Sequence, residues 1–294
     1  MTKAYGYAAT SILFWSTLAT VSKLLLNDFS SLQVLCVSSA FAFLALFLFN
    51  LTAGNFKKLR GTYGVKDVLW MSLTGLPGVC IYNLFLYAGT ARLLASQAFI
   101  INYLWPIMSV LFACLILKER LTLRKGIAFA LSFLGVAVVA GEELFSFQKD
   151  ALLGMLFCVS AAVSYGIFTT FTKMRQYDKK ISMMYAYLAT FLLTLIILLG
   201  SGGVRPMGLL PILGFGWNGV FVMALATTAW TIALESGATA KISNLAYITP
   251  FLSLVWTAIF LKEEIRLLSV LGLCIIVLGI LIQLVEPKKK EKLK

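Results

Sequence analysis

The sequence predicts an all-α integral membrane protein of ten transmembrane helices, arranged as two inverted five-helix repeats around a central cavity. Hydrophobic residues make up 60% of the chain and charged residues only 13%, whereas soluble domains carry about 25% charged residues. Ten apolar stretches follow one another, most of them near the ~20 residues that a spanning helix needs. The second half of the chain repeats the first. Because each half holds an odd number of spans, the second copy is expected to be inverted in the bilayer.

The first half contains five predicted spans, of which the last is short and begins with charged residues. They cover residues 4–26, 32–52, 67–89, 94–116 and 124–141. The second half contains the corresponding five, at residues 152–174, 181–200, 214–235, 242–261 and 266–285. The two halves meet between Gly141 and Asp150. We therefore expect a first repeat over 1–145, a second repeat over 146–286, and a basic cytoplasmic tail over 287–294.

Two motifs reveal the repeat directly. The segment 15–23, WSTLATVSK, returns as YGIFTTFTK at 165–173. The segment that begins at Tyr103 and ends in Leu-Lys-Glu-Arg-Leu at 117–121 returns from Tyr247 to Leu-Lys-Glu-Glu-Ile at 261–265. These motifs fall in the first and fourth spans of each half, so the repetition extends over most of both copies.

The net charge of +13 does not indicate a nucleic-acid partner, because its distribution fits the positive-inside rule. With the N-terminus in the cytoplasm, 19 Lys and Arg residues face the cytoplasm and 6 face the other side. The basic tail is then a topological anchor near acidic lipid headgroups. We expect a multi-pass protein of a bacterial-type inner membrane, with the lipid bilayer as its partner and both termini cytoplasmic.

The sequence offers no metal, cofactor or catalytic site. It has no histidine, and its five cysteines lie in apolar stretches without a C-x-x-C pair, which is typical of small apolar fillers. Every carboxylate lies at the end of a span or in a loop. Proton-coupled carriers commonly use a mid-membrane carboxylate or histidine, so we expect transport without an obligatory proton gradient and no enzymatic activity.

Aromatic and amide side chains inside the spans are the candidate substrate-binding residues. Superimposing the repeats brings Trp15 onto Tyr165, and Tyr103 onto Tyr247. For the third and eighth spans it brings Tyr82 onto Trp230. Buried Tyr and Trp need a hydrogen-bond partner, which a cavity provides; ordinary packing between helices is the alternative. The candidate set is Trp15, Tyr82, Asn83, Asn102, Tyr103, Trp105, Tyr165, Trp230 and Tyr247.

Three prolines inside spans predict interrupted helices. Pro77, Pro106 and Pro250 each lack an N–H, and therefore free the carbonyl four residues earlier. Free carbonyls at membrane depth are tolerated where they line a cavity or meet another polar group. Paired broken helices point to a transporter's binding site, although simple kinking is the alternative.

The aromatic start and lysine end of the first helix in each copy, with the Leu-Lys-Glu end of the fourth, resemble the EamA domain pair of the drug/metabolite transporter superfamily. Three stretches are similar to the YddG-type aromatic amino acid exporters: Leu13–Thr17, Asn102–Pro106, and Ala229-Trp230 with Thr249–Phe251. The resemblance implies a basket lined by helices 1, 3, 4, 6, 8 and 9, with helices 5 and 10 peripheral. It also implies that Tyr82, Tyr103, Trp105 and Tyr165 face the cavity.

The chain departs from that subfamily at two of these positions. Asn83 stands where some members have a histidine, and Tyr165 stands where a tryptophan is frequent.

The expected function is secondary transport. We expect export of a small-molecule substrate by alternating access, namely small amphipathic metabolites and above all aromatic or other apolar amino acids. The alternative is export of quaternary or polycyclic organic cations, since aromatic side chains also bind such cations. The sequence leaves the oligomeric state open.

Overall fold

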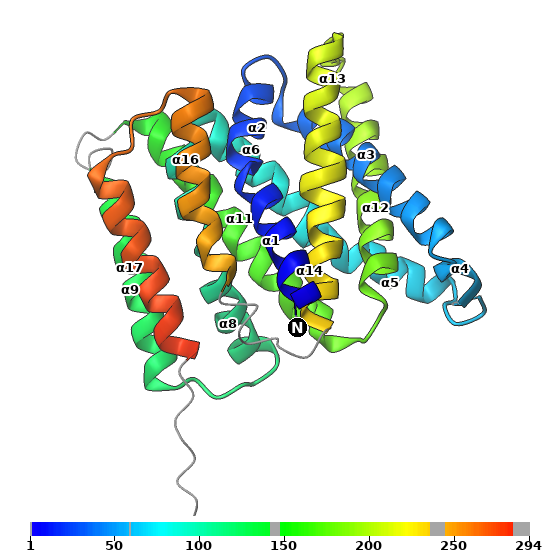
Figure 1. Cartoon of the computed structure of the whole chain (residues 1–294), viewed down its shortest axis with the longest axis horizontal. Helices are drawn as coiled ribbons and strands as arrows, with labels where there is room; N and C mark the ends of the chain where they lie inside the picture. The colour runs from blue at the N-terminus through cyan, green and yellow to red at the C-terminus, as the bar shows by residue number, and fades with distance from the viewer. Residues whose placement is uncertain (1, 59, 142–147, 236–244, 285–294) are drawn as a thin grey trace, which may run out of the picture.

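The computed structural model describes residues 2–58, 60–141, 148–235 and 245–284, which form helices joined by short connections (Figure 1). The first half comprises α1 (Thr2–Ser16), α2 (Leu18–Leu26), α3 (Ser31–Thr52), α4 (Asn55–Lys58), α5 (Val65–Leu76), the π-helical turn η1 (Pro77–Ile81), α6 (Tyr82–Arg92), α7 (Ala95–Asn102), α8 (Trp105–Ile116) and α9 (Leu123–Val139). The second half comprises α11 (Lys149–Met174), α12 (Lys179–Gly200), α13 (Leu209–Gly216), the π-helical η2 (Trp217–Leu225), α14 (Ala226–Glu235), η3 (Ala246–Ile248), α16 (Thr249–Leu261) and α17 (Leu267–Leu284).

Within the described ranges, seven helical segments are long and apolar enough to cross a membrane. They are Lys3–Leu26, Ser31–Thr52, Val65–Arg92, Ala95–Ile116, Lys149–Met174, Lys179–Gly200 and Leu209–Ala233. Each coincides with a predicted span. The remaining predicted spans, 124–141, 242–261 and 266–285, fall on the shorter α9, η3–α16 and α17. The chain is a multi-pass membrane protein; the predicted basic tail lies outside the described residues.

Contacts at both ends of α11 show that it runs antiparallel to the long α5–α6 segment. At one end, Arg92 Nε of α6 lies 3.2 Å from Asp150 Oδ1 of α11. At the other end, the hydroxyl of Tyr177, just after α11, donates to Asp67 Oδ1 of α5 at 3.0 Å. We call these the Arg92 end and the Asp67 end of the helix bundle.

Helix contacts between the two halves come in equivalent pairs: for each contact, the corresponding helices of the opposite halves also touch. The first helix α1 packs against α14, and its copy α11 packs against α6. Likewise α1 contacts α16 while α11 contacts α8, and α3 contacts η2 while α12 contacts α5. The second helices α3 and α12 pack against each other, as do the last helices α9 and α17, which lie together along one side of the bundle (Figure 1). The repeat seen in the sequence is therefore also present in the pattern of contacts.

The helix interruptions lie largely where proline predicts them. Pro77 begins the π-helical turn η1, Pro106 follows the break between α7 and α8, and Pro250 follows the single 3₁₀ turn η3. Two interruptions were not predicted: the split of the first span at Thr17 and the π-helical η2. At the split, the Thr17 hydroxyl donates to the carbonyl of Phe14 at 2.7 Å. A local side-chain bond of this kind competes with regular helix and needs no proline.

Close approach of α9 and α17 depends on glycine. A Cβ added to Gly135 would lie 2.6 Å from the carbonyl oxygen of Gly272, which is closer than non-bonded atoms approach. Small residues let membrane helices pack at short distance. Gly126, on the same helix, has no other atom within 4 Å of the position that a Cβ would take and is therefore a matched control.

Gly135→Ala is expected to lower the thermal stability of the purified protein in detergent. Overpacking a well-fitted contact costs about 1–3 kcal/mol, and here the obstructing atom belongs to the backbone. Gly126→Ala is expected to leave the melting temperature unchanged or raise it, since alanine is the better helix former by roughly 0.5–1 kcal/mol. Equal melting temperatures of the two variants would contradict close packing of α9 on α17.

Candidate functional site

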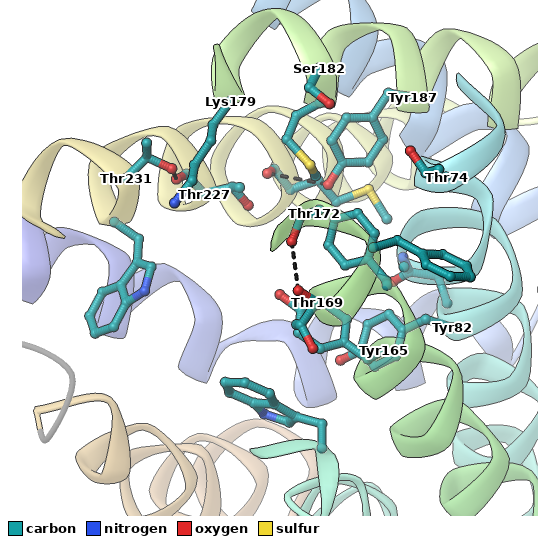
Figure 2. A pocket seen from close by; sticks show the side chains of 18 of the residues that line it. Thr74, Tyr82, Tyr165, Thr169, Thr172, Lys179, Ser182, Tyr187, Thr227 and Thr231 are labelled. Atoms are coloured by element: carbon teal, nitrogen blue, oxygen red, sulfur yellow. Dashed lines mark hydrogen bonds between the residues drawn. The ribbon is translucent and has the colours of Figure 1, made fainter. Parts of the chain in front are cut away.

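A cavity of about 710 Å³ lies between the helices (Figure 2). Its volume is in the range of small-molecule sites. Eight of the nine candidate residues line it: Trp15, Tyr82, Asn83, Asn102, Tyr103, Trp105, Tyr165 and Trp230. Tyr247 does not line it, and packs instead against the apolar core. The sequence repeat matches aromatic positions in three pairs of helices, but the matched residues Tyr103 and Tyr247 have different surroundings in the structure.

Two aromatic contacts in the cavity are equivalent under the repeat. The rings of Trp15 and Trp230 have centroids 5.4 Å apart and planes inclined at 55°. The rings of Tyr165 and Tyr82 have centroids 4.9 Å apart and planes inclined at 53°. Since the repeat superimposes Trp15 on Tyr165 and Trp230 on Tyr82, the same contact between the two halves is made twice, with different rings.

Tyr165 is the centre of a larger aromatic surface. Besides Tyr82, its ring meets Trp105 edge-on at 5.1 Å and Phe168 at 5.5 Å. Figure 2 shows Tyr82 and Tyr165 side by side at the cavity wall. Aromatic rings at these separations pack favourably, so the wall offers a rigid apolar surface on which another ring could stack.

Asn102 has an unpaired acceptor in the cavity wall. Its Nδ2 donates to the hydroxyl of Tyr82 at 3.0 Å. Its Oδ1 is buried and has no hydrogen-bond partner among the described residues. Leaving a buried acceptor unpaired costs about 1–3 kcal/mol, a cost that a ligand with an N–H or O–H donor would remove.

Other candidate polar groups are already used within the protein. Asn83 Nδ2 donates to the carbonyl of Val79 in its own helix at 2.7 Å. The hydroxyl of Tyr103 donates to the carbonyl of Ala246 at 2.8 Å. That carbonyl is the one that Pro250 frees. It also accepts from the backbone N–H of Thr249, so its acceptor capacity is used within the protein.

Hydroxyl groups form a second polar set, which the candidate set from the sequence does not include. The lining includes Thr74, Thr169, Thr172, Ser182, Thr227 and Thr231 (Figure 2). Thr169, Thr172 and Thr231 donate to carbonyls of their own helices at 2.8–2.9 Å, which leaves their oxygens as acceptors. The spacings of 169 to 172 and 227 to 231 place each pair on one helix face, and this signal could have found them.

The mouth of the cavity lies at the Asp67 end and carries its charged groups. Arg175, Asp178 and Lys179 are the charged residues in the described lining; the first two lie in the connection between α11 and α12, and Lys179 begins α12. The Arg175 guanidinium lies 4.6 Å from the Trp70 ring centroid and donates to Tyr177 at 2.9 Å. That hydrogen bond raises the pKa of Arg175. The described lining at the mouth therefore carries two basic side chains and one acidic one, and Arg175 Nη1 also lies 3.9 Å from Asp67 Oδ1 of α5.

Helix α12 extends the expected lining. It contributes Lys179, Ser182, Met183 and Tyr187, although the family resemblance places only helices 1, 3, 4, 6, 8 and 9 around the basket. The described parts of α9 and α17 contribute no lining residue, as the resemblance predicts for helices 5 and 10.

A multi-pass helical bundle with an interhelical cavity of this kind has the architecture of a membrane transporter. The chain belongs to the EamA-like transporter family, whose model matches it twice, over residues 2–141 and 152–285. The family is part of the drug/metabolite transporter superfamily. These matches cover both repeats and indicate a transporter rather than an enzyme.

Relatives of known sequence and structure agree with this assignment. An uncharacterized transporter of Archaeoglobus fulgidus is 26% identical over 95% of this chain and 98% of its own length. The aromatic amino acid exporter YddG of Ancylobacter novellus is 23% identical over 61% of this chain and 63% of its own. A protein of known crystal structure superimposes with a TM-score of 0.68, at 21% identity over 95% of this chain and 96% of that one, which supports the fold.

Tyr103→Phe is expected to destabilise the protein without changing its substrate preference. The substitution removes a buried hydrogen bond, worth about 0.5–1.5 kcal/mol, while the Ala246 carbonyl still accepts from the backbone N–H of Thr249. Tyr247→Phe is the matched control, because among the described residues the Tyr247 hydroxyl has no hydrogen-bond partner. Thermal unfolding in detergent compares the two; a stable Tyr103→Phe with altered substrate preference would instead place the Tyr103 hydroxyl on the substrate.

Proposed function

We propose that the protein exports small amphipathic metabolites, above all aromatic and other apolar amino acids, by alternating access of two inverted five-helix repeats, 1–145 and 146–286. The exchange-related helix contacts and the two family matches support the two-repeat architecture. The observation that carries the substrate class is the aromatic wall around Tyr165, which continues to a mouth with two basic side chains and one acidic one.

An amino acid matches the three chemical zones of the cavity. The rings of Trp15, Tyr82, Trp105, Tyr165 and Trp230 receive its apolar side chain. The ammonium donates to Asn102 Oδ1 and to threonine oxygens, which are available as acceptors. The carboxylate is attracted to Arg175 and Lys179 at the mouth. The name of the Ancylobacter novellus relative, aromatic amino acid exporter, points to the same substrate class.

The charges at the mouth disfavour the alternative of organic-cation export. Arg175 and Lys179 repel a cation that approaches from the Asp67 end. Asp178 is the one acidic side chain among the charged residues of the described lining, and its Oδ1 caps α12 by accepting from the backbone N–H groups of Lys180 and Ile181. The aromatic wall alone would bind an organic cation, but the basic side chains at the cavity mouth disfavour its entry.

The expected energy coupling depends on which charged residues and histidines lie deep in the cavity. Apart from the charged mouth, the described cavity lining contains no Asp, Glu, Lys or Arg, and the chain has no histidine. We therefore expect substrate exchange without an obligatory proton gradient, and no covalent chemistry, metal or cofactor.

Counterflow in proteoliposomes tests the function. Purified protein is reconstituted with unlabelled phenylalanine inside, and uptake of labelled amino acids is followed with and without a pH gradient. We expect exchange of phenylalanine, tyrosine and tryptophan in the absence of the gradient. Exchange of a quaternary ammonium compound with no exchange of any amino acid would overturn the proposal in favour of the cation alternative.

Trp105→Ala is expected to lower the preference for aromatic substrates. Loss of an aromatic contact costs ~0.5–1.5 kcal/mol beyond the lost buried area. This cost weakens the binding of phenylalanine about two- to tenfold and the binding of alanine less. Trp256→Ala is the matched control, because Trp256 lies outside the described lining and donates to Ser16. The ratio of phenylalanine to alanine transport, normalised to monodisperse protein, is the measurement. A ratio unchanged in Trp105→Ala would argue against stacking on this wall.

The Asp67 end is expected to face the cytoplasm, because the Lys and Arg distribution of 19 to 6 places it there. Cysteines replacing Lys57 and Lys179 in a cysteine-free background should resist an impermeant maleimide in whole cells and react in inverted vesicles. A cysteine at Arg205, on the expected outer side, serves as the positive control. Reaction at position 57 or 179 in whole cells would reverse the topology.

A further inference from the structure

Two glutamates occupy the same position in the two halves and are presented by the same backbone turn. Lys118 and Lys262 end α8 and α16 in the left-handed conformation, with φ of 57° and 55°. The next N–H, of Glu119 or Glu263, returns to the carbonyl six residues earlier at 3.3 or 3.4 Å, so each helix closes with a wide turn around a left-handed residue. A non-glycine residue in this conformation costs roughly 1–2 kcal/mol, and the chain accepts that cost at both sites.

Glu263 closes a charged junction at the Arg92 end. Its carboxylate accepts from the N–H groups of Ala95 and Ser96 at 2.7 and 3.0 Å, and from the Ser96 hydroxyl at 2.7 Å. These N–H groups begin α7, where a negative charge is favoured by the helix dipole. Glu263 thereby joins the end of α16, in the second half, to the start of α7, in the first.

Lys23 completes this junction from a third helix. Its Nζ donates to the carbonyls of Thr90 and Leu93 at 2.7 Å each, which end α6. Lys23 and Glu263 meet through this junction, because Lys23 binds the carbonyl of Leu93 and Glu263 binds the N–H of Ala95, two residues further on. These partly buried connections therefore hold α2, the α6–α7 junction and α16 together at the end of the bundle opposite the cavity mouth.

The repeat-equivalent pair lies at the Asp67 end and is looser. Lys173, the counterpart of Lys23, is 56% exposed and its Nζ lies 3.8 Å from the Glu119 carboxylate. Glu119 is 43% exposed and also meets Lys125 of α9 at 3.2 Å. Exposed pairs of this kind contribute little stability. The same two residue types thus make a closed junction at one end and a loose contact beside the open mouth at the other.

We propose that Lys23–Glu263 and Lys173–Glu119 are the two gates of the transporter, one at each end of the cavity, and that they tighten alternately. In the structure the Lys23–Glu263 gate is closed and the cavity opens at the Asp67 end. In the opposite state the Lys23–Glu263 gate separates while the Lys173–Glu119 gate becomes the tighter of the two. This inference rests on the proposed alternating access, because gates at two ends have a function only if the ends open in turn.

Side-specific labelling of the cavity tests the gates without any substrate. Thr169→Cys, in a background with the five native cysteines replaced, places one reporter in the cavity lining. An impermeant maleimide is applied to the Arg92 side or to the Asp67 side of oriented vesicles, and the two labelling rates are compared. The parent protein is expected to react faster from the Asp67 side.

Breaking the closed gate is expected to open the other side. Glu263→Gln and Lys23→Met should each raise the labelling rate from the Arg92 side by about tenfold, since hydrogen bonds to charged groups are worth about 1.5–3 kcal/mol. Glu119→Gln and Lys173→Met should leave that rate unchanged or lower it. Glu264→Gln is the matched control, because Glu264 adjoins Glu263, carries the same charge and is exposed.

Two results would overturn the gates: equal effects of Glu263→Gln and Glu264→Gln, or a shift in the same direction by variants at both ends. Size-exclusion profiles in detergent verify folding. If Glu263→Gln does not fold, Lys23→Met decides, because it leaves the cap on α7 in place. Failure of amino acid counterflow with a correct labelling pattern would refute the substrate class alone; counterflow with no labelling shift would refute the gates alone.

Discussion

Helices that end or break in a membrane protein leave backbone groups that lipid cannot satisfy, and the organisation of this protein depends on how those groups find partners. The N–H groups that begin α7 bind Glu263, and the carbonyls that end α6 bind Lys23. The carbonyl of Ala246, freed by Pro250, binds Tyr103. Each of these partners comes from a different helix. These helix ends and breaks are therefore the points where separate helices are joined.

Internal repetition explains why the joined points come in pairs. The contact of Trp15 with Trp230 has its equivalent in that of Tyr165 with Tyr82, and the turn before Glu263 has its equivalent before Glu119. What differs between the ends is how tightly the charged groups are held. Under the proposed alternating access, the second state is the one in which the junction is made at the other end.

The sequence was sufficient for those features that depend on local pattern. Hydropathy placed seven spans that the described residues contain as helices long and apolar enough to cross a membrane, and the repeat selected Trp15, Tyr82, Tyr165 and Trp230, all of which line the cavity. Features that depend on distances between remote helices were not predictable. The contribution of α12 to the lining and the pairing of Ala246 with Tyr103 belong to this group. Tyr247 shows how far the repeat can predict the site, because equal depth in the membrane did not give equal exposure to the cavity.

Photo-crosslinking with a diazirine analogue of phenylalanine tests most directly whether the cavity is the substrate site. The analogue is bound to the reconstituted protein, activated by light, and its attachment points are mapped by peptide mass spectrometry with and without excess phenylalanine. We expect competed crosslinks on cavity residues such as Trp105, Tyr165 and Trp230. Crosslinks confined to exposed apolar residues such as Leu210 or Ile196, or crosslinks that phenylalanine does not compete, would contradict a substrate site in this cavity.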